Sequence, residues 1–377
     1  MELAIRPVDP PRDDSPVTML ELFFDLVFVF VITQVTTLIN PASGLAGYGR
    51  AALVLSLTWY IYNGFAWLTN NVAPTTLSTQ LPMFAAMACF LAMAVVVPDA
   101  FGDGAWVFAL AYLAVVIIHA VQFARSSMGN SARAIREILP VNLTVAVLVV
   151  VAAAVGPASG WIAWCVAVAV IVLAATRPHV THFALRAHHF AERHQLLVII
   201  ALGETIIQVG QGSARHLMEP PVSAAFVAGL MLISALWWVY FGSGDDTRGA
   251  HAFSRIPDER RAVLGAQAYT TAHLLHISGL VLCAAGLHEA LRQPLQPLGL
   301  ALAITTSAGV ALFLSGQALF RRALSIGSSR PHLIAAVLGL AAAGVGVVGP
   351  ALALIAVLVF VLLGLSWQLG TERSAAR

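Results

Sequence analysis

Long apolar runs dominate this sequence and restrict it to one class of fold. About twelve stretches of apolar residues follow one another, each long enough for a helix of about 20 residues that crosses a bilayer. Only 10% of the residues are charged, against roughly a quarter in soluble domains. We therefore predict an all-α integral membrane protein with about twelve transmembrane helices.

The arginines test this number of helices. We expect the helices at 20–39, 50–69, 81–98, 105–123, 139–156, 160–176, 195–213, 222–241, 264–287, 297–320, 333–348 and 350–369. Cytoplasmic loops of membrane proteins carry an excess of basic residues. With the amino terminus in the cytoplasm, 17 of the 20 arginines fall on the cytoplasmic side, and the outside keeps Arg50, Arg215 and Arg292. This topology places both termini in the cytoplasm.

The predicted helices divide into two halves of six. The second and eighth helices carry similar aromatic groups, Trp59–Tyr62 and Trp237–Tyr240, and the first and seventh both follow a glutamate. Parallel repeats recur in transporters, with the binding site between the halves. Chance likeness among apolar helices is the alternative. We predict a cytoplasmic tail, a first half, a cytoplasmic amphipathic segment, a second half and a second cytoplasmic tail at 1–19, 20–176, 177–194, 195–369 and 370–377.

Two carboxylates lie on one face at the start of the first predicted helix. Glu21 and Asp25 are four residues apart, so they lie on the same side of a helix, one turn from each other. A carboxylate at a helix start can also cap free N–H groups, and this accounts for Glu21 as well as a functional role does. Asp25 lies a turn further in, where a charge is costly. We predict that both residues line a path for an ion or substrate.

Two further polar stripes lie deep inside predicted helices. Glu204 and Gln208 are one turn apart in the seventh helix, and Tyr269, His273 and His276 form a stripe in the ninth. An intramembrane glutamate indicates function, and histidine titrates near neutral pH. We assign all five residues to the same path, with structural hydrogen bonds between helices as the alternative.

The segment 177–194 is rich in arginine and histidine. We predict a helix continuous with the seventh span, whose solvated basic face touches anionic lipid. Metal binding is the alternative, through His179, His182, His188, His189 and His194. Within this segment, His189, Glu192 and Arg193 are predicted to form a cytoplasmic gate or latch.

The sequence lacks the motifs of several enzyme classes. It contains no Walker loop, no dinucleotide glycine fingerprint, no Gly-x-Ser-x-Gly, no His-Glu-x-x-His and no paired Cys-x-x-Cys. The three cysteines lie in apolar runs, so we expect buried thiols without a disulfide. Asp245 and Asp246 stand beside glycines, a pattern that favours a turn. We expect no cofactor, no metal ion and no nucleic-acid partner.

Two long motifs resemble those of a known family. ELFFDLVFVFVIT at Glu21–Thr33 and HFAERHQLLVIIALGE at His189–Glu204 are similar to the signatures of the bacterial low-temperature-requirement A family. The residues that match are Glu21, Phe23, Phe24, Asp25, Phe28, His189, Glu192, Arg193, Gly203 and Glu204, while Thr205 stands where serine is more usual. The resemblance implies a multi-pass protein of the bacterial inner membrane, named for growth in the cold, and assigns it no biochemical activity.

A shorter likeness concerns the first helix alone. Phe24-Asp25, with Val27-Phe28 and Ile32-Thr33, is similar to the Phe-Ser-Asp helix of a potassium channel family built from two six-helix repeats. This chain lacks the serine between Phe24 and Asp25, and its second half lacks the motif.

Three hypotheses about function follow. The leading one is a transporter or channel-like protein that moves a small solute or cation, alone or coupled to protons. Its partners would be the lipid bilayer and the transported species, and the sequence is compatible with either a monomer or an oligomer. The alternative is a membrane-embedded enzyme that acts on a lipid or another apolar substrate with glutamate and histidine as acid–base groups. It requires Glu204 near His273 in a cavity open to lipid. The third is a membrane-organising or lipid-sensing protein with structural carboxylates.

Overall fold

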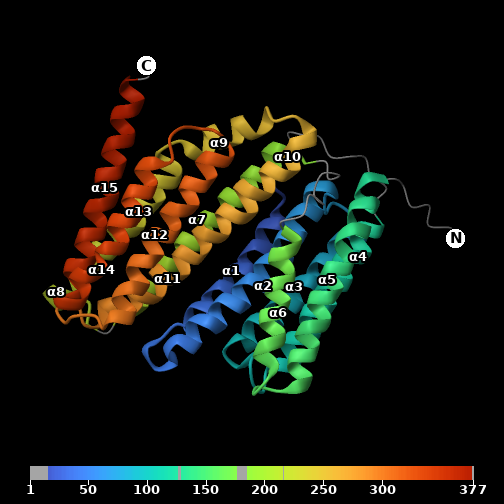
Figure 1. Ribbon diagram of the computed structural model, residues 1–377, viewed down its shortest axis with the longest axis horizontal. Coiled ribbons are helices and arrows are strands. Elements are labelled where there is room, and N and C mark those ends of the chain that lie inside the picture. The colour runs from blue at the N-terminus through green and yellow to red at the C-terminus, as the bar shows by residue number, and fades with distance from the viewer. Residues whose placement is uncertain (1–15, 126–128, 176–184, 215, 376–377) are drawn as a thin grey trace. The chain divides into compact units, whose positions relative to one another are not determined.

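The computed structural model describes residues 16–125, 129–175, 185–214 and 216–375, and these residues are almost entirely helical. The helices of the amino-terminal part are α1 (Met19–Thr37), α2 (Gly44–Asn71), α3 (Leu77–Val96), α4 (Ala105–Ala124), α5 (Gly129–Val155), α6 (Gly160–Ala175) and α7 (Ala187–Ser213). Those that follow are α8 (Pro220–Trp237), α9 (Asp245–Ser254), α10 (Asp258–Gly265), α11 (Ala272–Arg292), α12 (Leu300–Ala323), α13 (Arg330–Ala341), α14 (Ala343–Val348) and α15 (Ala351–Ala375) (Figure 1). The all-α fold class is confirmed.

The number of membrane helices agrees with the prediction. Within the described residues, 11 helical segments are long and apolar enough to cross a membrane. The apolar α6 has 16 residues and is shorter than these, and with it the predicted twelve are all present. The seventh helix differs most from its predicted range, because it starts eight residues earlier. It begins at Ala187 rather than at 195, so residues 187–194 of the histidine-rich segment belong to the same helix as the predicted span.

Helix packing divides the described chain into two compact units. The first contains the described residues of 1–34, 52–193 and 256–263, and the second contains those of 35–51, 194–255 and 264–377. Within the first unit, α3, α4, α5 and α6 pack in sequence order; within the second, α11, α12 and α13 do so, and α15 packs on α8 (Figure 1). That these units are related six-helix repeats stays a prediction.

One face of α1 is buried at helical spacing in the first unit. Glu21, Phe24, Asp25 and Phe28 are almost completely buried, whereas Phe23 on the opposite face is half exposed. On α2, Tyr62 stacks against Phe24 and Phe28, with ring centroids 5.9 and 4.1 Å apart. The two carboxylates therefore enter the core beside an aromatic face.

Glycines make the tightest helix contact of the second unit, between α11 and α12. A Cβ atom added at Gly279 would lie 2.6 Å from the carbonyl oxygen of Gly309, and one added at Gly309 would lie 2.6 Å from the nitrogen of Cys283. Small residues let membrane helices approach closely because little else drives their association in lipid. The close approach places His276 of α11 within hydrogen-bonding distance of Gln317 on α12, 3.1 Å away.

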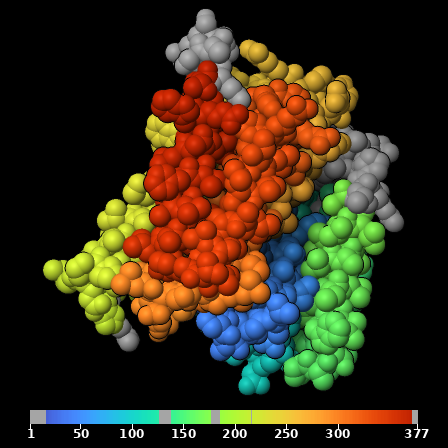
Figure 2. All heavy atoms as spheres, turned by 60° about the vertical axis from the view of Figure 1, so that its left-hand side comes forward, coloured from blue at the N-terminus to red at the C-terminus, as the bar shows by residue number. Residues whose placement is uncertain are grey.

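The outer faces of the helices are apolar, as a lipid environment requires. On α15, which lies on the surface shown in Figure 2, Phe360 and Trp367 are 72% and 77% exposed. The same effect makes the prediction of buried thiols wrong in part: Cys283 is buried, but Cys89 is half-buried and Cys165 is exposed, all three as free thiols. Apolar residues of a membrane protein face lipid as readily as the core, since lipid tails are as apolar as leucine.

Candidate functional site

The start of α1 is fixed by a reciprocal cap. The amide and hydroxyl of Thr18 both donate to Glu21 Oε2, at 2.9 Å each, and the Glu21 amide donates to Thr18 Oγ1 at 3.3 Å. This is the capping box that the pattern Thr-x-x-Glu forms at helix starts. Glu21 therefore caps the start of α1 through Oε2, and its Oε1 is left for another partner.

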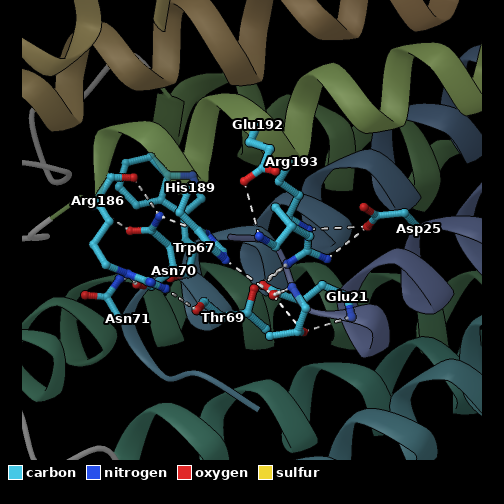
Figure 3. Close-up of polar contacts among 12 residues, drawn as sticks. Glu21, Asp25, Trp67, Thr69, Asn70, Asn71, Arg186, His189, Glu192 and Arg193 are labelled. Atoms are coloured by element: carbon cyan, nitrogen blue, oxygen red, sulfur yellow. Dashed lines mark hydrogen bonds and ion pairs between the residues drawn. The ribbon is translucent and has the colours of Figure 1, made fainter. Parts of the chain in front are cut away.

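That partner is Arg193, which binds both carboxylates of α1. Its Nη2 lies 3.0 Å from Asp25 Oδ1 and its Nη1 lies 3.4 Å from Glu21 Oε1 (Figure 3). Nη1 also donates to the hydroxyl of Thr69 on α2. Arg193, Glu21 and Asp25 are fully buried. A buried charge needs this kind of pairing, because its desolvation is otherwise uncompensated.

Aromatic and amide groups complete the cluster. Tyr62 donates its hydroxyl to Asp25 Oδ1 at 2.8 Å. His189 Nε2 lies 3.3 Å from Glu21 Oε2, and its Nδ1 lies 3.4 Å from the Asn70 amide nitrogen (Figure 3). Because the Asn70 amide donates to Nδ1, Nε2 carries the ring proton and donates to Glu21. His189 therefore links Glu21 of α1 to Asn70 of α2.

A second arginine closes the end of α2. Arg186 Nε donates to the Asn70 carbonyl at 2.5 Å, and its Nη2 donates to the Thr69 carbonyl at 3.0 Å. The Asn70 side chain in turn bonds to the backbone of Arg186, at 2.9 and 3.0 Å. A cation on the last carbonyls of a helix is favourable, because these are free and carry the negative end of the dipole.

These contacts correct the prediction for 177–194. In its described part, 185–194, Arg186, His189 and Arg193 are buried, so they do not form a solvated basic face on lipid. The reason is that carboxylates and helix-end carbonyls within the first unit provide better partners than lipid headgroups. His179 and His182 lie outside the described residues.

The cluster holds two carboxylates and one guanidinium. Arg193 binds both Glu21 and Asp25, and the His189 ring contacts Glu21. Asp25 Oδ2 is buried and has no hydrogen-bond partner among the described residues. An unpaired buried polar atom is unfavourable. The cluster can therefore accept one further positive charge at Asp25, either a proton or a cation.

A separate polar cluster lies in the second unit. Arg321 Nη1 lies 2.7 Å from each oxygen of Asp245, and Gln317 Nε2 donates to Asp245 Oδ2 at 2.8 Å. Arg248 also contacts Asp245 Oδ1. Gln317 Oε1 accepts from His276 Nε2 at 3.1 Å. Both Asp245 oxygens have partners here, so this carboxylate is compensated in a way that Asp25 is not.

His273 lies in the same unit beside an irregular part of the helix. Its Nδ1 is 2.9 Å from the carbonyl of Ala268 in a π-helical stretch, η5 (Ala266–Thr271), and its Nε2 is 2.7 Å from the Tyr240 hydroxyl. A carbonyl only accepts, so Nδ1 carries the proton and Nε2 accepts from Tyr240. The ring of Tyr269 stacks on His273 at 5.4 Å. Such π-helical stretches occur frequently at functional sites.

Glu204 and Gln208 pair with each other along α7. Gln208 Nε2 donates to Glu204 Oε1 at 2.9 Å, and both side chains are largely buried. Among the described residues, Glu204 makes no hydrogen bond to His273. Glu192, which was predicted for the latch, forms its described hydrogen bond outside the cluster. Its Oε2 accepts a hydrogen bond from the Val17 amide at 3.2 Å (Figure 3).

Comparison with known proteins gives the chain a family. Residues 16–367 match the model of the family described as bacterial low temperature requirement A protein. The chain belongs to this family. An uncharacterized protein of Rhizobium meliloti (strain 1021) is 26% identical over 331 residues, which cover 83% of this chain and 79% of that protein.

The low temperature requirement A resemblance rests on two motifs, and the structure brings them together. Glu21 and Asp25 of the α1 motif contact His189 and Arg193 of the α7 motif directly. Two of the residues predicted for the path, Glu21 and Asp25, therefore share one cluster in the first unit with two of those predicted for the latch, His189 and Arg193.

Several members of the clusters were missed by sequence reasoning. In the first unit these are Tyr62, Thr69, Asn70 and Arg186, all bonded to the cluster or to the end of α2. The available signal was a run of polar residues, Thr69–Asn71, at the end of an apolar span. A buried membrane-helix end needs partners for its free carbonyls, and such polar runs can provide them.

The prediction for Asp245 was wrong. This residue was predicted to lie in a turn, but the turn ends at Gly244, whose φ of +66° is left-handed, and Asp245 is the first residue of α9. The glycine indicated the turn correctly, since it adopts a positive φ without strain. The pattern did not show that the next side chain is fully buried against Arg321.

Proposed function

We propose that this low temperature requirement A protein is a transporter or channel-like protein that moves a small solute or cation across the membrane, alone or coupled to protons. Asp25 is the group to which the cation or proton binds. Asp25 Oδ2, a buried carboxylate oxygen without a hydrogen-bond partner, carries this proposal. Ionisable groups inside membrane segments commonly mark ion paths and proton relays.

Charge balance explains why a cation suits this place. Counted formally, with both carboxylates ionised, the contact group of Glu21, Asp25 and Arg193 has a charge of −1. A cation or proton at Asp25 brings this charge to zero. A neutral group is easier to hold in a low-dielectric interior than an isolated charge. Binding and release of the cation therefore change the strength of the Arg193 ion pairs.

The same contacts suit a latch. Arg193 joins α7 to α1 through two ion pairs, and Glu192 joins α7 to the chain before α1 through the Val17 amide. When Asp25 is neutralised, its attraction to Arg193 weakens, and α1 and α7 are less tightly held. In the proposal, His189, Glu192 and Arg193 form this latch, and Glu204, Gln208, Tyr269, His273 and His276 belong to the path.

The enzyme alternative finds less support in the second unit. It needs Glu204 and His273 within proton-transfer reach of one substrate. Glu204 instead pairs with Gln208, and His273 is bonded at both nitrogens, to Tyr240 and to the Ala268 carbonyl. The hydrogen bonds of Glu204 and His273 thus engage each group with different partners.

The variant Asp25→Asn tests the proposal. Asparagine keeps an oxygen for Arg193 and Tyr62 and places a neutral amide at the position of the unpaired Oδ2, so the change removes the charge with little change of shape. We expect at least a tenfold loss of cation or proton flux in proteoliposomes, equivalent to about 1.4 kcal/mol or more. Membrane insertion should stay close to that of the wild type. Glu204→Gln keeps the acceptor for Gln208 and should also abolish flux.

Glu219→Gln is the matched control, because this carboxylate is 62% exposed and pairs only with the exposed His216 among its described contacts. It should transport like the wild type. Full flux in both Asp25→Asn and Glu204→Gln would show that the site is assigned wrongly. A wild type without flux under any cation gradient would refute transport, and lipid products would then be sought.

A further inference from the structure

A cavity lies in the first unit, away from the charge cluster. It has a volume of about 280 Å³ and lies where α4 begins and where α5 connects to α6. Ligand pockets of proteins are typically roughly 300–1,000 Å³. This one therefore suits a small group rather than a large substrate.

Glycine keeps part of this cavity open. Gly156, in the connection between α5 and α6, has a φ of +78°, and a Cβ added there would have no heavy atom within 4 Å. Another residue would be strained in this left-handed conformation and would place a side chain at the cavity. The cavity is therefore bounded at Gly156 by backbone atoms alone, with no side chain to fill it.

Aromatic rings form the other walls. Trp164 is only 3% exposed and packs on Phe101 and Phe108, with ring centroids 4.6 and 5.0 Å away. Trp106 and Trp161 also line the cavity and are about half exposed. The face of a tryptophan ring carries negative potential and attracts cations, and quaternary ammonium groups are commonly bound by such aromatic walls.

One charged side chain completes the lining. Asp103 is the single charged residue among the described residues that line the cavity. It is exposed, precedes the first turn of α4, and has no basic residue of the lining to neutralise it. A carboxylate beside aromatic faces selects a positive charge and opposes an anion.

We propose that this cavity binds the ammonium head of a small organic cation of the choline type. Trp106, Trp161 and Trp164 surround the methylated nitrogen, and Asp103 supplies the counter-charge. An aromatic belt at the membrane surface would explain the two half-exposed tryptophans. It does not explain a carboxylate that shares the same cavity with them.

Choline titration of the purified protein in maltoside detergent, followed by calorimetry, tests the proposal. The neutral isostere 3,3-dimethyl-1-butanol has the shape of choline without its charge, and we expect choline to bind about tenfold more tightly. Asp103→Asn should weaken choline binding by about tenfold, and Trp161→Leu by about fivefold. Glu259→Gln, an exposed carboxylate of the same unit outside the cavity, should leave the affinity unchanged.

The source of the cation is distinguished by short-chain lipids. If the site holds a lipid headgroup, dihexanoylphosphatidylcholine competes with choline and dihexanoylphosphatidylglycerol does not. If it holds a soluble amine, neither lipid competes. Equal binding of choline and its neutral isostere would overturn the proposal. So would unchanged choline affinity in Asp103→Asn, because a carboxylate that only favours the amino-terminal end of α4 has no effect on a ligand.

Discussion

Arg193→Leu is expected to lower the free energy of unfolding by about 3–5 kcal/mol. Arg193 is fully buried and is the guanidinium that pairs with both Glu21 and Asp25. Its removal leaves two buried carboxylates without their guanidinium partner, four residues apart on one face of α1. Thermal melting in detergent and the yield of monodisperse protein measure the loss.

The triple variant Glu21→Gln, Asp25→Asn, Arg193→Leu distinguishes charge from packing. Replacing all charged members of a buried ion cluster by well-packed neutral residues of similar volume removes their desolvation cost and is often neutral or stabilising, whereas removing one member is strongly destabilising. We therefore expect the triple variant to regain most of the stability that Arg193→Leu loses. Its transport should stay lost, because the charge of Asp25 is absent.

Arg292→Ala serves as the control. This arginine is 62% exposed, and its Nη1 pairs with Glu289 Oε1 at 3.5 Å near the protein surface. Surface pairs contribute roughly 0–1 kcal/mol, so its effect should be small. A triple variant as unstable as Arg193→Leu would contradict the charge argument. The stability would then come from the packing of the guanidinium near the Phe24 and Tyr62 rings, whose centres lie 5.7 Å away.

The membrane class and the helix ranges could be predicted because they depend on local composition. A run of about 20 apolar residues is sufficient to indicate a span, whatever lies next to it. The start of α7 shows the limit of this reasoning. Arg186, His189 and Arg193 are polar enough to suggest a surface segment, yet they lie at or within the first two turns of a spanning helix.

Partner choice could not be predicted, because it depends on which helices pack together. Sequence spacing placed Glu21 and Asp25 on one face, and the structure agrees. It could not show that Arg193, 168 residues later, lies opposite them. Nor could it distinguish Asp25, with one unpaired oxygen, from Asp245, whose oxygens both have partners.

The same limit explains why some predicted path residues bond along their own helix and others bond to a different helix. Glu204 and Gln208 were predicted from a stripe along one helix, and they do bond along that helix. His276 was predicted from a stripe on α11, but its partner Gln317 is on α12. Local periodicity finds polar faces, and only the fold decides which of them meet.

Gly279→Ala, in the contact between α11 and α12, is expected to lower the free energy of unfolding by about 1–3 kcal/mol. The added methyl would lie 2.6 Å from the Gly309 carbonyl oxygen and 2.7 Å from the Phe313 nitrogen. Both are backbone atoms, so the helices themselves must separate. Gly309→Ala should act similarly, because its Cβ would lie 2.6 Å from the Cys283 nitrogen.

Separation of these helices also has a local consequence. The hydrogen bond from His276 to Gln317 crosses the same contact at 3.1 Å, and the Asp245 cluster depends on Gln317. The control is Gly364→Ala on α15, where a Cβ would have no heavy atom within 4 Å. Alanine is a better helix former than glycine by about 1 kcal/mol, so this variant should melt at or above the wild-type temperature. If Gly279→Ala melts like Gly364→Ala, the close approach of α11 and α12 does not stabilise the protein.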